Sequence, residues 1–236
     1  MTSGHPSPYR AGPITNPYKT RPMTAEANDV DRLLQRAAEG DSQGWELLFT
    51  EYRERLRRML ALRLDQRLQG RIDASDVIQE TYLEAWGRLA EYLREPKMPF
   101  YLWLRFLAGQ KLVTLQRHHL GAHMRDVGRE VSLYRGALPE TSSAALAAQL
   151  LGHEPRPSEA AMRAELKIRL QEALNGMDPL DREVLALRHF EQLSRAETAQ
   201  VLGIQESATS KRYVRALRRL KEILASMPGG LGEILP

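Results

Sequence analysis

Apolar residues recur every three or four positions along most of this chain, which is the spacing of one face of an α-helix. Segments with this pattern run from near Asp29 to Arg63, from Asp73 to Leu93, from Phe100 to His119, from Glu159 to Leu174 and from Pro179 to Phe190. No segment keeps up the strict alternation of a half-buried strand over a useful length. The pattern therefore predicts an all-α protein.

Two stretches without helical periodicity divide the chain. Residues 1–26 are rich in Pro, Gly, Ser and Thr, and residues 129–158 shift to Ala, Ser, Gly and Pro with few charges. We therefore expect a disordered leader over 1–26, a helical domain over 27–128, a linker over 129–158, a second helical domain over 159–226 and a flexible tail over 227–236. Within the linker, residues 143–151 predict one short helix. The expected architecture is two small helical domains joined by a flexible linker.

The sharpest local pattern predicts a helix-turn-helix near the C-terminus. Ser194 and Glu197 have the spacing of a capping box, in which the Ser hydroxyl and the Glu carboxylate accept hydrogen bonds from free amides at a helix start. Ala199 is small enough to let a second helix approach. Gly203 suits a turn that needs a positive φ. A long helix is expected from about Glu206, with one face made of Thr209, Tyr213, Ala216, Leu217 and Leu220.

The other faces of this long helix are basic. They carry six cations with no acidic residue among them: Lys211, Arg212, Arg215, Arg218, Arg219 and Lys221. A basic helix that follows a tight turn is the geometry that enters the major groove of DNA. A solvated amphipathic helix would have a similar pattern, but the capping box, the glycine turn and the cations in one register favour nucleic-acid binding.

Composition restricts the remaining function classes. The chain has 236 residues and a formal net charge of only +4, so its basic surface must be local and offset by acidic surface elsewhere. It has no cysteine, which excludes disulfides, cysteine-ligated zinc and thiol chemistry. No apolar run approaches the ~20 residues of a membrane span, and the N-terminus lacks the pattern of a secretory signal. We expect a cytoplasmic protein with no membrane partner.

The helix expected over residues 73–89 has an acidic face. Asp73, Asp76, Glu80 and Glu84 share one arc, and Ile78, Tyr82, Ala85, Trp86 and Leu89 lie opposite. The acidic row is either a solvated face or a docking surface for a basic partner. A helical metal-dependent hydrolase that uses Asp73, Asp76, Glu80 and His119 is a rival interpretation. One helix face does not surround a metal or grip both sides of a scissile bond, so we predict no metal, no cofactor and no enzymatic activity.

Aromatic residues are densest between Phe100 and Phe106, and cations follow at Lys111 and Arg117. Such a helix can simply supply core, or its aromatic and cationic side chains can stack on unpaired bases. His119 and His123 are spaced i, i+4, which could hold a metal. No third ligand follows at a suitable spacing, so the metal interpretation is not adopted.

These segments together resemble the bacterial sigma-70 family, specifically its short two-domain extracytoplasmic-function (ECF) type. Residues 73–86, Asp-Ala-Ser-Asp-Val-Ile-Gln-Glu-Thr-Tyr-Leu-Glu-Ala-Trp, resemble the region 2.2 motif Asp-Ala-x-Asp-Val-x-Gln-Glu-x-Phe-x-x-x-Trp. Residues 100–117 are similar to regions 2.3 and 2.4, and residues 177–220 to region 4. The resemblance covers roughly residues 37–224 without the linker.

The resemblance implies an RNA polymerase sigma factor that binds core polymerase and directs promoter recognition and transcription initiation. Docking on the clamp helices of the largest polymerase subunit would involve Asp73, Asp76, Gln79, Glu80, Glu84 and Trp86. Recognition and melting of the −10 element would involve Trp103, Gln110, Lys111 and Arg117. Reading of the −35 element would involve Ser207, Ser210, Lys211, Arg212, Arg215, Arg218 and Arg219. An anti-sigma factor is a further candidate partner.

Two departures from the family pattern affect promoter preference. Thr209 stands where the family commonly has an apolar residue, and residues 109–114 replace the usual Arg-Asn-x-x-x-Asp of region 2.4. The family's −35 and −10 preferences therefore do not transfer to this chain. The alternative function is a stand-alone helix-turn-helix regulator, which would bind a palindrome as a dimer without polymerase and would leave the acidic helix unexplained.

Overall fold

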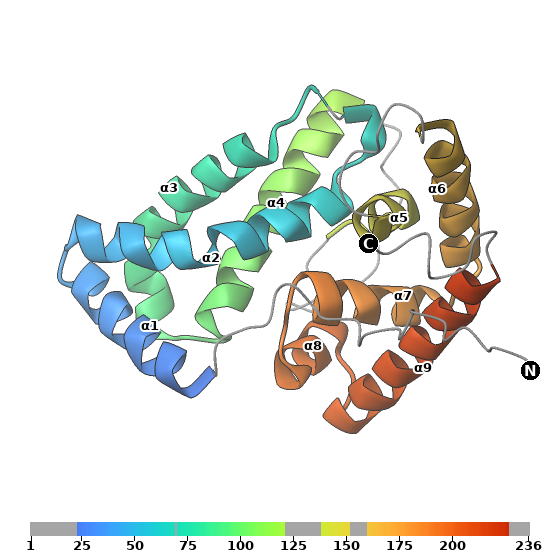
Figure 1. Cartoon of the computed structure of the whole chain (residues 1–236). Coiled ribbons are helices and arrows are strands. Elements are labelled where there is room, and N and C mark those ends of the chain that lie inside the picture. The colour runs from blue at the N-terminus through green and yellow to red at the C-terminus, as the bar shows by residue number, and fades with distance from the viewer. Residues whose placement is uncertain (1–22, 69, 121–137, 152–159, 227–236) are drawn as a thin grey trace, which may run out of the picture. The chain divides into compact units, whose positions relative to one another are not determined.

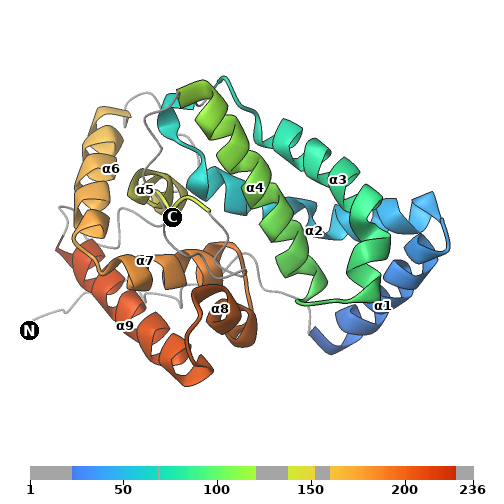
Figure 2. The same ribbon diagram turned by 180° about the vertical axis from the view of Figure 1, so that it is seen from behind.

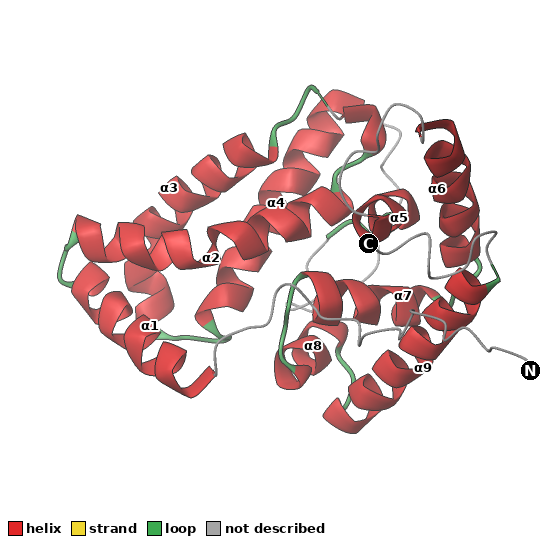
Figure 3. Ribbon diagram, in the orientation of Figure 1, coloured by secondary structure: helices red, strands yellow, loops and turns green. Residues whose placement is uncertain are grey.

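The computed structural model describes residues 23–68, 70–120, 138–151 and 160–226, and within these ranges the regular structure is helical, with no strand (Figure 3). The α-helices are α1 (Met23–Ala38), α2 (Ser42–Arg63), α3 (Ala74–Arg94), α4 (Phe100–Leu120), α5 (Ser143–Leu151), α6 (Ala160–Asn175), α7 (Pro179–Leu185), α8 (Arg195–Leu202) and α9 (Glu206–Ala225) (Figure 1). The predicted all-α class is confirmed.

The chain divides between Leu48 and Phe49 into two compact units. The first unit contains α1 and the start of α2. Asp41 caps this start, because its carboxylate accepts hydrogen bonds from the amides of Gln43 (3.0 Å) and Gly44 (3.1 Å). The α1 helix begins at Met23, six residues before the periodicity that the sequence shows.

In the second unit, α3 and α4 lie side by side (Figures 1 and 2). The capping carboxylate of Asp73 accepts a hydrogen bond from the amide of Ser75 at 2.8 Å and begins α3. The buried apolar residues of the two helices are Val77, Ile78, Ala85, Leu89, Phe100, Tyr101, Leu102, Trp103, Leu104, Leu107, Ala108 and Leu112. This packing fixes which face of α3 remains outside.

Helices α7, α8 and α9 form the helix-turn-helix part of the same unit. Both hydrogen bonds of the capping box between Ser194 and Glu197 are present at the start of α8. Gly203 ends α8 with φ of 64°, the left-handed conformation that the turn requires. Thr209 is fully buried, and its hydroxyl donates to the carbonyl of Gln205 at 3.2 Å, so this polar residue is satisfied in an apolar position.

Two expectations about the helices are corrected, one is confirmed, and others fall outside the described ranges. Residues 179–190 are not one α-helix, because α7 gives way to a π-helix, η4 (Ala186–Phe190), closed by a bond from the amide of Glu191 to the carbonyl of Ala186. Leu217 is 38% exposed rather than on the buried face of α9. The short helix at 143–151 is confirmed as α5. The leader up to residue 22, His123 and the tail 227–236 lie outside the described residues.

Removal of the capping box is expected to destabilise the helix-turn-helix. Ser194→Ala leaves the amide of Glu197 without its capping oxygen, and loss of such a cap costs about 1 kcal/mol. Urea unfolding measures the free energy of unfolding. Ser207→Ala is the matched control, because this exposed serine provides no cap for α9, and its effect is expected within about 0.5 kcal/mol. Equal losses of unfolding free energy in both variants would contradict the role of Ser194 as the cap of α8.

Candidate polymerase and nucleic-acid interfaces

The acidic row of α3 lies on the exterior of the second unit. Asp73, Asp76, Gln79 and Glu80 are exposed. Glu84 is partly covered, and it forms ion pairs with Lys111 of α4 at 3.1 Å and with Arg88 at 3.1 Å. Burial alone would raise the pKa of Glu84, but the hydrogen bonds from Lys111 and Arg88 outweigh it and lower the pKa. The carboxylate is therefore held in its charged form.

Two apolar side chains of α3 are exposed as well, among them Trp86, which was expected on the face opposite the acidic row. Leu83 is 62% exposed and Trp86 is 37% exposed. Exposed apolar groups beside charges are typical of a surface that is covered by a partner. Sequence reasoning included Trp86 and missed Leu83. Their spacing of three residues indicates that Leu83 and Trp86 lie close together on α3. Whether they are exposed depends on which face of α3 packs on α4, and the sequence alone does not show this.

The four residues predicted for the −10 element differ in exposure. Gln110 and Arg117 are exposed on α4. Trp103 is only 8% exposed, and its ring stacks on Tyr92 with centroids 4.6 Å apart. Lys111 is shared between Glu84 and, at 3.7 Å, Glu80. The structure thus links a predicted DNA contact to two predicted polymerase contacts through ion pairs.

The residues predicted for the −35 element lie along α9. Ser207, Lys211 and Arg218 are exposed, and the hydroxyl of Ser210 donates to the carbonyl of Glu206 at 3.4 Å. Arg219 pairs with Glu222 at 3.3 Å on the exposed side of the helix. This face offers hydroxyl donors at the N-terminal end of the helix and cations after them.

Asp181 of α7 is a functional candidate that sequence reasoning missed. Its side chain is 7% exposed and receives hydrogen bonds from Arg215 at 2.6 and 2.7 Å and from Arg212 at 2.7 Å. The two carboxylate oxygens of Asp181 hold the guanidinium groups of Arg212 and Arg215 against α7. No local signal could reveal this contact, because 31 and 34 residues separate Asp181 from its partners.

Asp181 also makes stability depend on pH. Burial tends to raise the pKa of Asp181, but the hydrogen bonds from Arg215 and Arg212 outweigh it and lower the pKa. A lowered pKa adds stability above the unfolded value near about 3.9, and this stability is lost as the pH falls through the folded pKa. Asp181→Asn should lose about 1–2 kcal/mol at pH 7 and show a flatter acid limb in urea unfolding.

The control for this pH dependence is Asp29→Asn, which removes an exposed carboxylate paired with Arg32. Exposed pairs contribute little, so its acid limb should match that of the parent chain. An unchanged acid limb in Asp181→Asn would show that the carboxylate does not hold the two arginines in solution.

Metal-ligating clusters and membrane-spanning helices are both absent from the residues that the structure describes. Among those residues, no group of three or more His, Asp or Glu side chains is placed to hold a metal ion. None of the described helices combines the length and the apolar character needed to cross a membrane.

Comparison with known proteins places this geometry in a family. The family described as sigma-70, region 4 matches residues 167–220. The chain is 30% identical over 200 residues to the ECF RNA polymerase sigma factor ShbA of Streptomyces griseus, covering 84% of this chain and 96% of ShbA. It is 24% identical over 192 residues to the ECF RNA polymerase sigma factor BldN of Streptomyces coelicolor, covering 81% of this chain but only 64% of BldN.

A solved structure supports the fold. CnrH in complex with the cytosolic domain of CnrY aligns with a TM-score of 0.50 at 22% identity, over 85% of this chain and 99% of CnrH. The acidic α3, the helix-turn-helix and the alignment that covers 96% of ShbA at 30% identity agree with one another. The chain therefore belongs to the sigma-70 family, as an RNA polymerase sigma factor of the ECF type.

Proposed function

We propose that this chain binds core RNA polymerase through α3 and directs it to promoters through α4 and α9. The observation that carries this proposal is the separation of charge: α3 presents carboxylates, whereas α9 presents cations. An acidic surface attracts a basic protein partner and repels DNA, whereas a basic helix attracts DNA and repels a basic protein. Residues 27–128 would serve polymerase binding and the −10 element, and residues 159–226 the −35 element.

On α3, the proposed docking surface combines Asp76, Gln79 and Glu80 with the exposed side chains of Leu83 and Trp86. In the complex, Leu83 and Trp86 would bury apolar surface against the clamp helices of the largest polymerase subunit. The carboxylates would orient α3 on those helices. Lys111 holds Glu84 beside this surface. The proposal thus extends the predicted set by Leu83.

On the DNA side, Ser207, Ser210 and Lys211 are proposed to approach base edges, because they lie on the first turns of α9. Arg215, Arg218 and Arg219 follow on later turns and would contact phosphates. On α4, exposed Gln110 and Arg117 are proposed to contact the opened −10 element. Buried Trp103 would support that helix through its stack on Tyr92.

The proposed activity is binding and positioning, without catalysis by this chain. Polymerase and promoter DNA lie inside the bacterial cell, so we place the protein in the cytoplasm. The solved CnrH is held in complex with the cytosolic domain of CnrY. By analogy, we propose an anti-sigma factor as a regulatory partner of this chain.

Capture of core polymerase tests this function directly. Purified chain is mixed with core RNA polymerase from its own host, and the complex is isolated and used for run-off transcription on genomic fragments. Complex formation with new transcription start sites is the expected result. Failure to bind core, together with dimeric binding to a palindrome by the chain alone, would instead support the stand-alone regulator.

A further inference from the structure

Asp181 of α7 holds one edge of an arginine on α9 that remains largely exposed. The Nε and Nη2 atoms of Arg215 donate to the two carboxylate oxygens of Asp181 at 2.6 and 2.7 Å. Nη1 of Arg212 donates to one of the same oxygens at 2.7 Å. A two-point contact fixes the plane of a guanidinium group, which a single hydrogen bond does not. The side chain of Arg215 is nevertheless 57% exposed, against 27% for Arg212.

The guanidinium group of Arg215 keeps hydrogen-bond donors for a further partner. The contact with Asp181 uses one N–H on Nε and one on Nη2. Both hydrogens of Nη1 and the second hydrogen of Nη2 are left over. Within the residues that the structure describes, Arg215 forms no other hydrogen bond or ion pair. Free donors are thus carried by a group whose orientation Asp181 has already set.

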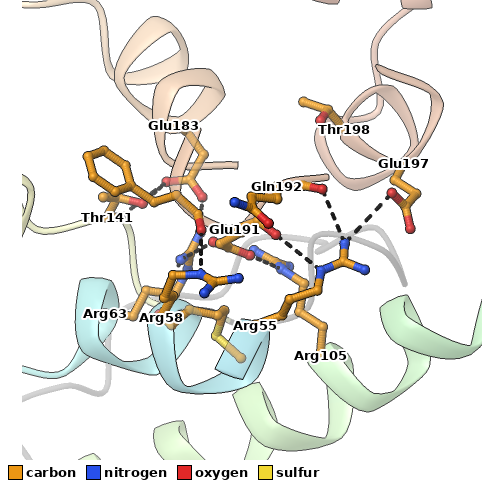
Figure 4. A network of polar contacts seen from close by, with 12 residues as sticks. Arg55, Arg58, Arg63, Arg105, Thr141, Glu183, Glu191, Gln192, Glu197 and Thr198 are labelled. Atoms are coloured by element: carbon orange, nitrogen blue, oxygen red, sulfur yellow. Dashed lines mark hydrogen bonds and ion pairs between the residues drawn. The ribbon is translucent and has the colours of Figure 1, made fainter. Parts of the chain in front are cut away.

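A second buried carboxylate shows that not every pairing of this kind leaves donors available. Glu191, which directly follows η4, accepts a hydrogen bond from Arg105 at 2.7 Å and pairs with Arg63 (Figure 4). The side chains of both arginines are buried, so neither has an exposed edge to offer a ligand. The chemistry at Asp181 is the same, but there one of the two arginines reaches solvent. This difference in exposure gives the Asp181 contact a second possible use besides stability.

The other exposed cations of α9 are not held in this way. Lys211 and Arg218 are exposed and form no ion pair with any residue that the structure describes. Arg219 pairs only with Glu222, across one exposed turn of the same helix. A long side chain without a firm partner loses rotamer freedom when it binds a ligand. Arg215 has already lost most of that freedom, so its binding to a ligand requires less reordering.

Asp181 and Arg215 line a cleft between α9 and the residues just before α7. The cleft has a volume of about 430 Å³, and residues 176–178, Arg212 and Arg219 also line it. Its three arginines outnumber its two aspartates, so the cleft keeps a net positive charge. A phosphate group of a DNA strand is negatively charged and accepts paired hydrogen bonds from a guanidinium edge. The cleft therefore suits one phosphate of the DNA backbone.

We infer that Asp181 is a positioning residue for recognition of the −35 element. It orients Arg215 for one phosphate of the DNA backbone, and this contact sets the register of α9 in the major groove. Phosphate contacts fix the placement of a recognition helix on the duplex, and the contacts to base edges depend on that placement. The inference rests on the proposed function, because it needs α9 to bind the −35 element.

The −35 selectivity of the holoenzyme tests this positioning. It is the ratio of two affinities, one for a promoter fragment found by run-off transcription and one for the same fragment with its −35 element scrambled. In Asp181→Asn, Arg215 keeps its charge but loses its two-point contact with a carboxylate. The ratio should fall about two- to tenfold, as expected when a contacting side chain must be immobilised on binding. Affinity for the scrambled fragment should not fall, because the general attraction of cations for DNA remains.

A double-mutant cycle separates positioning from a general loss of structure. Arg215→Ala should lower the ratio by itself, and Asp181→Asn should then add little, because the residue that it positions is absent. Glu222→Gln is the matched control, since it also removes one negative charge beside an arginine of α9, and it should keep the ratio within about twofold. If Asp181→Asn fails to fold by circular dichroism, Arg215→Lys replaces it. Lysine keeps the cation at this exposed position but cannot form the two-point contact, so the same fall is expected.

Three outcomes overturn the inference. An unchanged ratio in the folded variant shows that a fixed orientation of Arg215 is not needed. Additive losses in the double variant show that Asp181 acts without Arg215. An equal fall in Glu222→Gln shows an effect of net charge alone. A parent holoenzyme that binds both fragments equally refutes the proposed −35 role itself, and with it the inference, before any variant is compared.

Discussion

Glu80→Lys is expected to weaken binding of core RNA polymerase by about 30-fold or more. The side chain of Glu80 is 50% exposed on the acidic row of α3. Reversing a charge at the centre of a complementary interface costs at least about 2 kcal/mol, because an attraction is replaced by a repulsion. Fluorescence anisotropy of the labelled chain, titrated with core polymerase, measures the change in Kd.

Folding should survive this substitution. The pair between Glu80 and Lys111 is long, at 3.7 Å, and Lys111 retains Glu84 at 3.1 Å. The matched control is Glu54→Lys on α2, an exposed glutamate that pairs with Arg57 at 3.2 Å and lies outside the proposed docking surface. Equal loss of affinity in both variants would indicate a general effect of charge. Unchanged affinity in Glu80→Lys would remove this residue from the polymerase interface.

The sequence was sufficient wherever the deciding interactions are local. Ser194 and Glu197 lie three residues apart and satisfy each other's backbone, so the start of α8 could be predicted from their spacing alone. Gly203 and the short helix α5 were predictable for the same reason. Helix propensities, caps and turns depend on near neighbours, and near neighbours are visible in the sequence.

The contacts that set the role of each cation were not predictable, because they join distant parts of the chain. Periodicity places Arg212 and Arg215 on a basic helix but cannot show that Asp181 of another helix binds both. The π-helix at the end of α7 turns Glu191 toward Arg105, 86 residues earlier. Leu217 was misplaced because the buried stripe of α9 follows Thr209, Ala216 and Ile223, which repeat every seven residues and leave a narrower face than the wheel suggests.

Removing two cations from α9 should reduce the salt dependence of promoter binding. Lys211→Ala combined with Arg215→Ala should lower the slope of log K against log salt by about 1.8, since each phosphate contact contributes about 0.9. At about 0.1 M salt the same loss corresponds to roughly 60-fold weaker binding. Filter binding of the holoenzyme to a promoter fragment found by run-off transcription, from low to moderate salt, gives both quantities.

The size of the slope change distinguishes the roles of the two residues. Lys211 is exposed, whereas Arg215 is tied to Asp181 although 57% of its side chain remains exposed. A loss of about 0.9 would mean that only Lys211 reaches a phosphate and that Arg215 serves to hold α9 on α7. The control pair Lys167→Ala and Arg169→Ala removes two cations from α6 and should leave the slope unchanged. An unchanged slope in the α9 variant would exclude this face of α9 from DNA contact. Binding releases fewer counterions whenever a phosphate contact is lost, so the slope would have to fall.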